Sequence, residues 1–265
     1  MKLLCFLIII SVSSAAVAVE RVEFATHYDH PPFILDIKDQ TGLVFDLANY
    51  LSKQSKGRYE FQVTFVPRER LQNYLVKKQK VVIPFVSPKW FDDVDQSRYL
   101  WTGILLMDQN VVVTLAKKKF EYKGPDSLTG KTMGYVLGHK MPAIEPLVNQ
   151  GKIKREESPS MIGNFKKLVE GRVDFVVTGE MIAKDLIARE NWQIRLSISK
   201  EPIDVFERRV LISPHSEVGL QKWLNIELKT LMRSPRWRTF LERYNAQNLS
   251  IAVPEESDRK PAKVD

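Results

Sequence analysis

Apolar and polar positions in the first half of the chain alternate between two periodicities. Runs at 22–27, 59–66 and 81–86 predict strands, and the last of these is continuously apolar, as in a strand that is covered on both faces. Between them, apolar residues at helical spacing in 43–51 and 71–75 predict two helices. The order strand, helix, strand, helix, strand favours an α/β sheet.

The second half continues in the same style and ends in helices. The predicted strands are 111–115, 131–137 and 173–178, and the predicted helices are 141–148, 162–169 and 183–188. An extended segment follows at 206–213, which we expect to cross back to the first half of the chain. Apolar faces then predict two amphipathic helices, one running from Leu220 to Leu231 and one from Trp237 to Tyr244.

Both ends of the sequence differ in character from this globular part. Lys2 precedes an apolar run at 3–10, and small residues lead to Ala16-Val17-Ala18, the pattern of a signal peptide over 1–18 that is cleaved after Ala18. The apolar run is shorter than the roughly 20 residues of a membrane span. Residues 251–265 are rich in proline and charge and are expected to form a disordered tail. We therefore expect the mature protein to be exported to the periplasm.

Composition removes several classes of function. The 265 residues include one cysteine, so neither an intrachain disulfide nor a cysteine-based zinc site is possible. The net charge of +8 is concentrated in 111–209, with 18 Lys and Arg against 13 Asp and Glu, and this argues against a nucleic-acid partner. The sequence also has no metal-ligand spacing, phosphate loop or nucleophile elbow. We expect no cofactor, no metal, no catalytic residue and no enzymatic activity.

Three motifs, in order along the chain, resemble one protein family. They are Tyr28…Pro31-Pro32-Phe33…Gly42…Phe45-Asp46, then Leu128-Thr129-Gly130-Lys131…Gly134, and then Leu168-x-x-Gly171-Arg172-Val173-Asp174. This order and spacing resemble the amino-acid-type periplasmic solute-binding proteins (bacterial extracellular solute-binding protein family 3). The resemblance implies the α/β, two-lobe periplasmic-binding-protein fold (type II), with a ligand cleft between lobes joined by two hinge strands. Lobe one would be 19–110 plus 210–250, and lobe two 111–209.

The candidate ligand residues follow from where the predicted strands end. Open α/β sheets bind ligands beyond the carboxyl ends of their strands, and a glycine before a predicted helix at 141–148 offers backbone N–H groups to an anion. Tryptophans at family pocket positions suit a cyclic or cationic ligand, although core packing explains them equally well. The predicted site comprises Tyr28, Phe33, Ser87, Lys89, Trp90, Trp101, Thr102, Gly138, His139, Lys140, Thr178 and Glu180.

The family's two amino-acid anchors are not in place. The resemblance implies a Thr-x-x-Arg motif after the third strand, whose arginine binds the ligand's α-carboxylate. Here that stretch reads Ser87-Pro88-Lys89-Trp90-Phe91-Asp92-Asp93. The aspartate that would pair with the α-ammonium falls on Gly179, with Glu180 beside it. The sequence therefore does not predict a free α-amino acid as the ligand.

Three functions remain open at this point. The first is a monomeric periplasmic protein that captures a small polar solute, amino-acid-like or a small organic acid or amine, for an ABC permease or a membrane sensor. The second is a secreted, dehydratase-like enzyme on the same scaffold, with Glu180 or His139 as its acid or base. The third is an interaction protein whose cleft has lost ligand binding.

Overall fold

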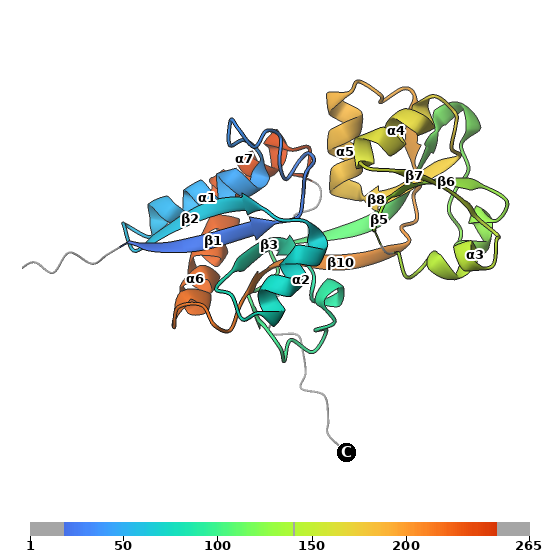
Figure 1. Cartoon of the computed structure of the whole chain (residues 1–265). Helices are drawn as coiled ribbons and strands as arrows, with labels where there is room; N and C mark the ends of the chain where they lie inside the picture. Colours follow the sequence, from blue (N-terminus) through green and yellow to red (C-terminus); the bar gives the residue numbers. More distant parts are fainter. Residues whose placement is uncertain (1–18, 140, 248–265) are drawn as a thin grey trace, which may run out of the picture.

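The computed structural model describes residues 19–139 and 141–247, which form two α/β lobes connected by two long strands (Figure 1). The predicted signal peptide, Lys140 and the predicted tail lie outside the described residues. Among the described helices, none has the length and apolar character that a membrane span requires.

Lobe one is built on three parallel strands in the order β2-β1-β3. Its strands are β1 (Glu20–Thr26), β2 (Tyr59–Phe65), β3 (Val82–Val86) and the short β4 (Leu100–Trp101). Its helices are α1 (Leu43–Gln54), α2 (Arg68–Val76), the 3₁₀ helix η1 (Pro88–Phe91), α6 (Leu220–Arg233) and α7 (Pro235–Arg243). Helices α1, α6 and α7 pack on one face of the sheet, and α2 and η1 pack on the other.

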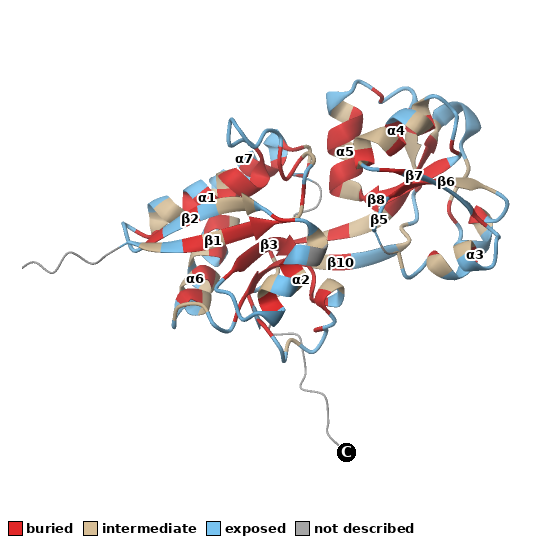
Figure 2. Ribbon diagram, viewed as in Figure 1, coloured by how far each residue is buried: buried red, intermediate tan, exposed pale blue. Residues whose placement is uncertain are grey.

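Lobe two repeats this layered arrangement around the strand order β8-β6-β7. Its strands are β6 (Thr132–Val136), β7 (Lys154–Ser158), β8 (Phe175–Gly179) and β9 (Leu196–Ile198). Its helices are α3 (Glu145–Asn149), α4 (Met161–Val169) and α5 (Glu180–Arg189), preceded by the 3₁₀ turns η2 (Ala116–Lys118) and η3 (Pro125–Leu128). Figure 2 shows that buried residues line the sheets and the inner faces of the helices in both lobes.

Two hinge strands, β5 (Leu106–Leu115) and β10 (Asp204–Ile212), run between the lobes (Figure 1). They pair antiparallel where they cross, with Phe206 opposite Asp108 and Arg208 opposite Leu106. Beyond the crossing, β10 pairs with β3 of lobe one and β5 pairs with β8 of lobe two. The sheets of both lobes therefore form one hydrogen-bonded path through the hinge strands.

The motif around Gly42 has a packing explanation. Gly42 has a φ of 129°, and a Cβ there would lie 2.4 Å from the carbonyl oxygen of Phe33. This close approach lets Leu43 and Val44, at the start of α1, donate their N–H groups to the carbonyls of Pro32 and Phe33. The Pro-Pro-Phe loop is thereby fixed over the helix N-terminus, which holds the Phe33 ring at the edge of lobe one.

The predicted elements are confirmed with small changes in their bounds, except for one helix. The predicted helix 141–148 begins only at Glu145, so Gly138 is followed by a turn and not by a helix N-terminus. Pro142 disfavours helical backbone angles at Met141, and residues 142–144 form a turn before the helix begins. Pro146 is accommodated because it lies in the first turn of α3. The expected anion site on helical N–H groups directly after Gly138 is therefore wrong.

Candidate functional site

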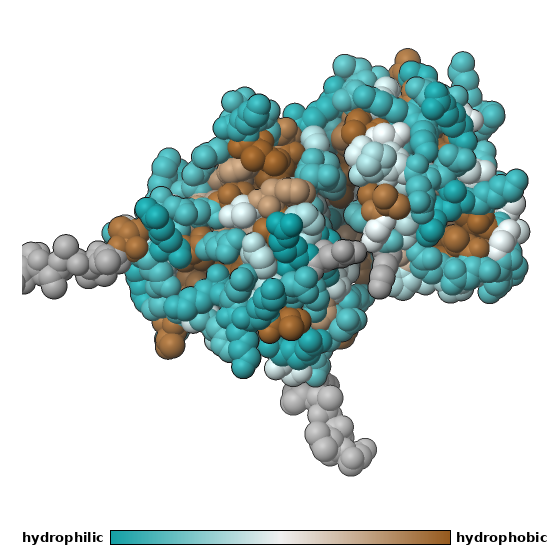
Figure 3. Space-filling view, viewed as in Figure 1, coloured by the Kyte–Doolittle hydropathy of each residue, from teal (hydrophilic) through white to brown (hydrophobic). Residues whose placement is uncertain are grey.

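The carboxyl ends of the parallel strands in the two lobes face each other beside the hinge strands. In lobe one, Tyr28 follows β1 and Ser87 follows β3; in lobe two, His139 follows β6. His139 is exposed, yet its pKa is lowered, first by the protein that surrounds it and then by the charge of His30 of lobe one. Figure 3 shows a crease where the lobes meet. The two edges therefore define an inter-lobe cleft as the candidate site.

A buried ion pair lies at the back of this cleft, on the hinge strands. Arg208 of β10 donates from Nε and Nη2 to Oδ2 of Asp108 on β5, at 2.9 and 2.6 Å. Its Nη1 donates to the Tyr28 hydroxyl at 2.7 Å and to the Phe85 carbonyl at 2.9 Å. The side chains of the pair are 2% and 0% exposed. We call Arg208 and Asp108 the hinge pair.

Aromatic rings surround the guanidinium of the hinge pair. Its central carbon lies 4.9 Å from the ring centre of Phe33, 5.4 Å from that of Trp90 and 5.0 Å from that of Phe206. Phe33 also stacks on Tyr28 with ring centres 3.8 Å apart. The rings stabilise a cation through their negative faces. In this protein the cation among them is therefore Arg208 itself.

The backbone at Phe85, near the end of β3, has an unusual conformation that points its carbonyl oxygen at this network. Its φ is 59°, a left-handed conformation that is unusual for a bulky side chain. Such a conformation costs about 1–3 kcal/mol and persists only where neighbours enforce it. Here the carbonyl of Phe85 accepts hydrogen bonds from both Tyr28 and Arg208. The strain is therefore compensated by satisfying the buried guanidinium.

Asp108 also connects the hinge to lobe two. Its Oδ1 accepts the backbone N–H groups of Gln109 at 2.9 Å and of Met181, in the first turn of α5, at 3.3 Å. The neighbouring Glu180 bonds Lys184 at 2.8 Å with one oxygen and the Gln109 amide at 3.0 Å with the other. Both carboxylates at this end of lobe two are thus occupied by partners from the protein.

Three polar groups at the edge of lobe one lack such partners. Among the described residues, the buried atoms without a hydrogen-bond partner include Nδ1 of His27, Nη1 of Arg68 and Oγ of Ser87. An unpartnered buried group costs about 1–3 kcal/mol, more if it is charged. Burial and the positive charge of Arg68 hold the pKa of His27 well below its usual range, so its imidazole is neutral at pH 7.

The structure brings most of the predicted site residues to the cleft. Tyr28, Phe33, Ser87 and Trp90 gather at the lobe-one edge. Lobe two contributes Gly138, His139, Thr178 and Glu180 at the ends of β6 and β8. Lys89, next to Trp90, is exposed.

Trp101 and Thr102 lie instead inside lobe one. Trp101 is 5% exposed, packs against Phe91, and donates its indole N–H to buried Asp93 at 2.7 Å. The Thr102 hydroxyl donates to the Gly103 carbonyl and accepts the N–H of Val210. These bonds use the polar atoms of both side chains within lobe one, so we leave Trp101 and Thr102 out of the proposed site.

Sequence reasoning missed four residues of the site: His27, Arg68, Asp108 and Arg208. One signal was present, since Arg208 and Arg209 directly precede the apolar run 210–212 of their strand, and both are buried. A buried arginine in a strand requires a carboxylate partner. Its partner, 100 positions earlier in the chain, could be found only from the register of the hinge strands.

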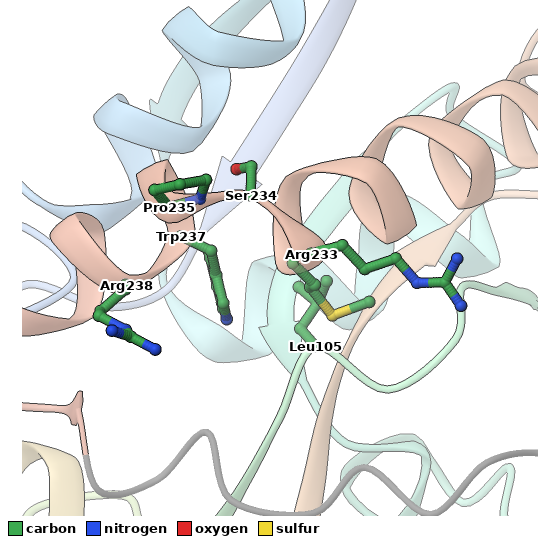
Figure 4. Close-up of a pocket in the computed structure, with 7 residues that line it drawn as sticks. Leu105, Arg233, Ser234, Pro235, Trp237 and Arg238 are labelled. Carbon is green, nitrogen blue, oxygen red and sulfur yellow. The ribbon is translucent and has the colours of Figure 1, made fainter.

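A hollow of about 390 Å³ lies outside the cleft, at the junction of α6 and α7 (Figure 4). Its lining residues are Leu105, Met232, Arg233, Ser234, Pro235, Trp237 and Arg238. None of the predicted ligand residues lines it. Within the described residues there is also no group of three or more His, Cys, Asp or Glu side chains that is arranged to hold a metal ion.

Comparisons with known proteins identify the fold. No protein-family model matches the chain, and no curated protein matches it significantly. Among solved structures, an ancestral arginine-binding protein bound to arginine has a TM-score of 0.64 at 18% identity, covering 84% of this chain and 97% of that one.

Two further solved structures are similar to this chain over most of its length. One comes from a study of glutathione import via GshT and the cystine ABC importer TcyBC of Streptococcus mutans. Its TM-score is 0.67 at 16% identity, and the match covers 85% of this chain and 95% of that one. AncCDT-1, an ancestral amino-acid-binding protein and precursor of cyclohexadienyl dehydratase, has a TM-score of 0.62 at 18% identity, covering 84% and 94%. The chain therefore has the two-lobe fold of the periplasmic solute-binding proteins, as its motifs predicted.

Proposed function

We propose that this protein is a periplasmic solute-binding protein, which captures a small polar solute between its lobes and presents it to an ABC permease or a membrane sensor. The observation that carries the proposal is the pair of strand edges that face each other beside two hinge strands, with polar side chains from both lobes. The names of the structural neighbours, which include amino-acid binding and import proteins, support it.

The hinge explains how capture would work. Two strands are the only named elements that connect the lobes among the described residues, so small backbone changes in β5 and β10 open or close the cleft. The hinge pair ties β10 to β5 at the crossing and adds Tyr28 and the Phe85 carbonyl of lobe one. Closure would then move lobe two toward the hinge pair and the edge of lobe one, and would remove water from around the ligand.

A thermal-shift screen tests the proposal. The purified mature chain would be heated with amino acids, amines and small carboxylates, each at about 100 times the dissociation constant of a real ligand. Binding would then stabilise the protein by about 2.7 kcal/mol, or roughly 5–11 °C in melting temperature for a chain of this size. A stabilising compound that is recovered unchanged supports the proposal. Conversion of the compound would favour the dehydratase-like alternative, and no shift with any class would favour an interaction protein.

A further inference from the structure

The three unpartnered groups of lobe one lie together because of strand order. β1 lies between β2 and β3, and its register places Thr26 beside Phe65 and Phe24 beside Val82. One step further, His27 lies beside Val66 and near the end of β3. Arg68 follows Val66 closely, and Ser87 directly follows β3. Since neighbouring strands are about 4.8 Å apart, His27 lies between Arg68 and Ser87 on this edge.

These groups are held in place but left unsatisfied. Ser87 is fully buried, and its hydroxyl has no partner among the described residues. Arg68 lies 3.9 Å above the Phe91 ring and donates from Nη2 to the Trp90 carbonyl, which leaves Nη1 free. Of the six unpartnered buried side-chain atoms in the described residues, three are on this edge. Buried polar groups are normally paired, so a ligand is the expected partner.

The chemistry of the three groups selects an oxyanion. Arg68 and Ser87 supply N–H and O–H donors, and the neutral His27 imidazole supplies a third in the tautomer that is protonated on Nδ1. No described carboxylate forms an ion pair with Arg68. Burial lowers the pKa of its guanidinium, and the nearby Tyr28 and Asp92 oppose that shift only in part. The nine-residue helix α2 also begins at Arg68, and its N-terminus adds positive potential.

The two carboxylates at the lobe-two end of the hinge strands, Asp108 and Glu180, are not free to bind an ammonium group. A Cβ at Gly179, where the family places its aspartate, would lie 3.0 Å from Asp108 Oδ2 and 3.1 Å from Arg208 Nη2. The hinge pair therefore fills the space that an anchoring side chain would need. Asp108 is occupied by Arg208 and two backbone N–H groups, and Glu180 is occupied by Lys184 and Gln109.

We propose that Arg68, Ser87 and His27 form an anion subsite, and that the protein's ligand is a small organic acid without an α-ammonium group. Trp90 and Tyr28 lie beside the subsite and favour an acid with an apolar body. This inference rests on the proposed function, because it names the class of solute that the cleft captures.

Matched acids test the ligand class by titration calorimetry on the purified mature chain. The pairs differ only in the α-amino group: succinate and L-aspartate, glutarate and L-glutamate, 3-phenylpropionate and L-phenylalanine. We expect the acid without the amino group to bind at least tenfold tighter in the pair that binds best. Equal or tighter binding of the amino acid would overturn the inference and leave the proposed function standing. Tight binding of inorganic phosphate or sulfate, with no organic acid binding, would overturn the organic-acid assignment. No binding by any probe would overturn both.

Two variants test the subsite with the best-binding acid as the probe. Ser87→Ala should weaken binding about tenfold while the unliganded protein melts at the same temperature or higher, because the variant deletes a buried hydroxyl that has no partner. Arg68→Gln should weaken binding more than tenfold, and Arg70→Gln, an exposed arginine on the same helix, should leave it unchanged. Wild-type affinity in both Ser87→Ala and Arg68→Gln would remove the subsite from lobe one. A large loss of stability in Ser87→Ala would also contradict it.

Discussion

The hinge pair gives the sharpest prediction about what holds the two lobes together. Replacing Arg208 with Met leaves the Asp108 carboxylate buried with only two backbone N–H donors, and replacing Asp108 with Leu leaves the guanidinium with only neutral acceptors. The double variant Arg208→Met/Asp108→Leu has no buried charge at this place. A double-mutant cycle therefore separates the cost of an orphaned charge from the value of the pair.

The magnitudes follow from the burial of the pair. Its side chains are 2% and 0% exposed, so water cannot solvate the charge that remains after a single substitution. Breaking a buried pair in this way costs about 3–5 kcal/mol, whereas replacing both partners with apolar residues is often neutral. For a chain of this size, each kcal/mol shifts the melting temperature by about 2–4 °C. We expect each single variant to melt about 6–20 °C lower, and the double variant to recover most of that loss.

Urea unfolding followed by tryptophan fluorescence measures the cycle, and thermal melts check it. Arg243→Met is the matched control, because Arg243 also bonds an aspartate, Asp46, at 2.7 Å, but its side chain is 55% exposed. We expect Arg243→Met to lower the free energy of unfolding by less than about 1 kcal/mol. The reasoning is refuted if Arg208→Met costs no more than the control, or if the two single costs simply add in the double variant.

Three further predictions follow from other positions. Gly179→Ala should lower the free energy of unfolding in urea by about 1–3 kcal/mol, because its Cβ would overlap the hinge pair. The control Gly103→Ala, whose Cβ would have no neighbour closer than 3.9 Å, should lower it by less than half as much. Equal losses in the two variants would contradict the overlap. Burial lowers the pKa of His27, so the unfolded chain takes up its proton first, and His27 should reduce the free energy of unfolding below pH 6.5 by up to about 1.4 kcal/mol per pH unit. Because His30 and His139 also have lowered pKa values, His27→Gln should reduce the slope of stability against pH between pH 5 and 7 without abolishing it, and an unchanged slope would exclude His27. Trp101→Ala should cost about 3–5 kcal/mol, because it empties a core position; a melting temperature close to wild type would return Trp101 to the cleft.

The fold was predictable because it rests on local patterns. The alternation of strands and helices survives in the structure, since each apolar run lies on a buried face of its sheet or helix. The Pro-Pro-Phe…Gly motif was informative for a physical reason: only glycine at position 42 permits the loop to approach α1 so closely. The one misplaced helix start lies beside a proline: Pro142 disfavours helical angles at Met141, and α3 begins only at Glu145, after a turn at 142–144.

The site was less predictable because its chemistry depends on distant pairs. Asp108 lies in a segment that reads as an ordinary strand, and nothing near it in sequence shows that Arg208 neutralises it. Trp101 shows the opposite case: a family position suggested the cleft, with core packing as the equal alternative, and a hydrogen bond to Asp93 holds the indole within lobe one. Whether a polar side chain has a hydrogen-bond partner depends on which strands and loops meet at the edge of the folded sheet. No local sequence pattern carries that information.

The two missing anchors of the sequence are explained by one arrangement. In an amino-acid site, the protein supplies an arginine for the carboxylate and a free carboxylate for the ammonium. Here Asp108 is neutralised within the protein by Arg208, and the pair occupies the space beside Gly179. An ammonium group bound beside Gly179 would therefore lose its hydration without gaining Asp108 as a counter-ion, which is unfavourable in a buried place. A carboxylate faces the reverse situation, because Arg68 already bears a buried Nη1 with no partner. The loss of the ammonium anchor and the placement of a new cation at the edge of lobe one thus favour the same ligand, an acid without an amine.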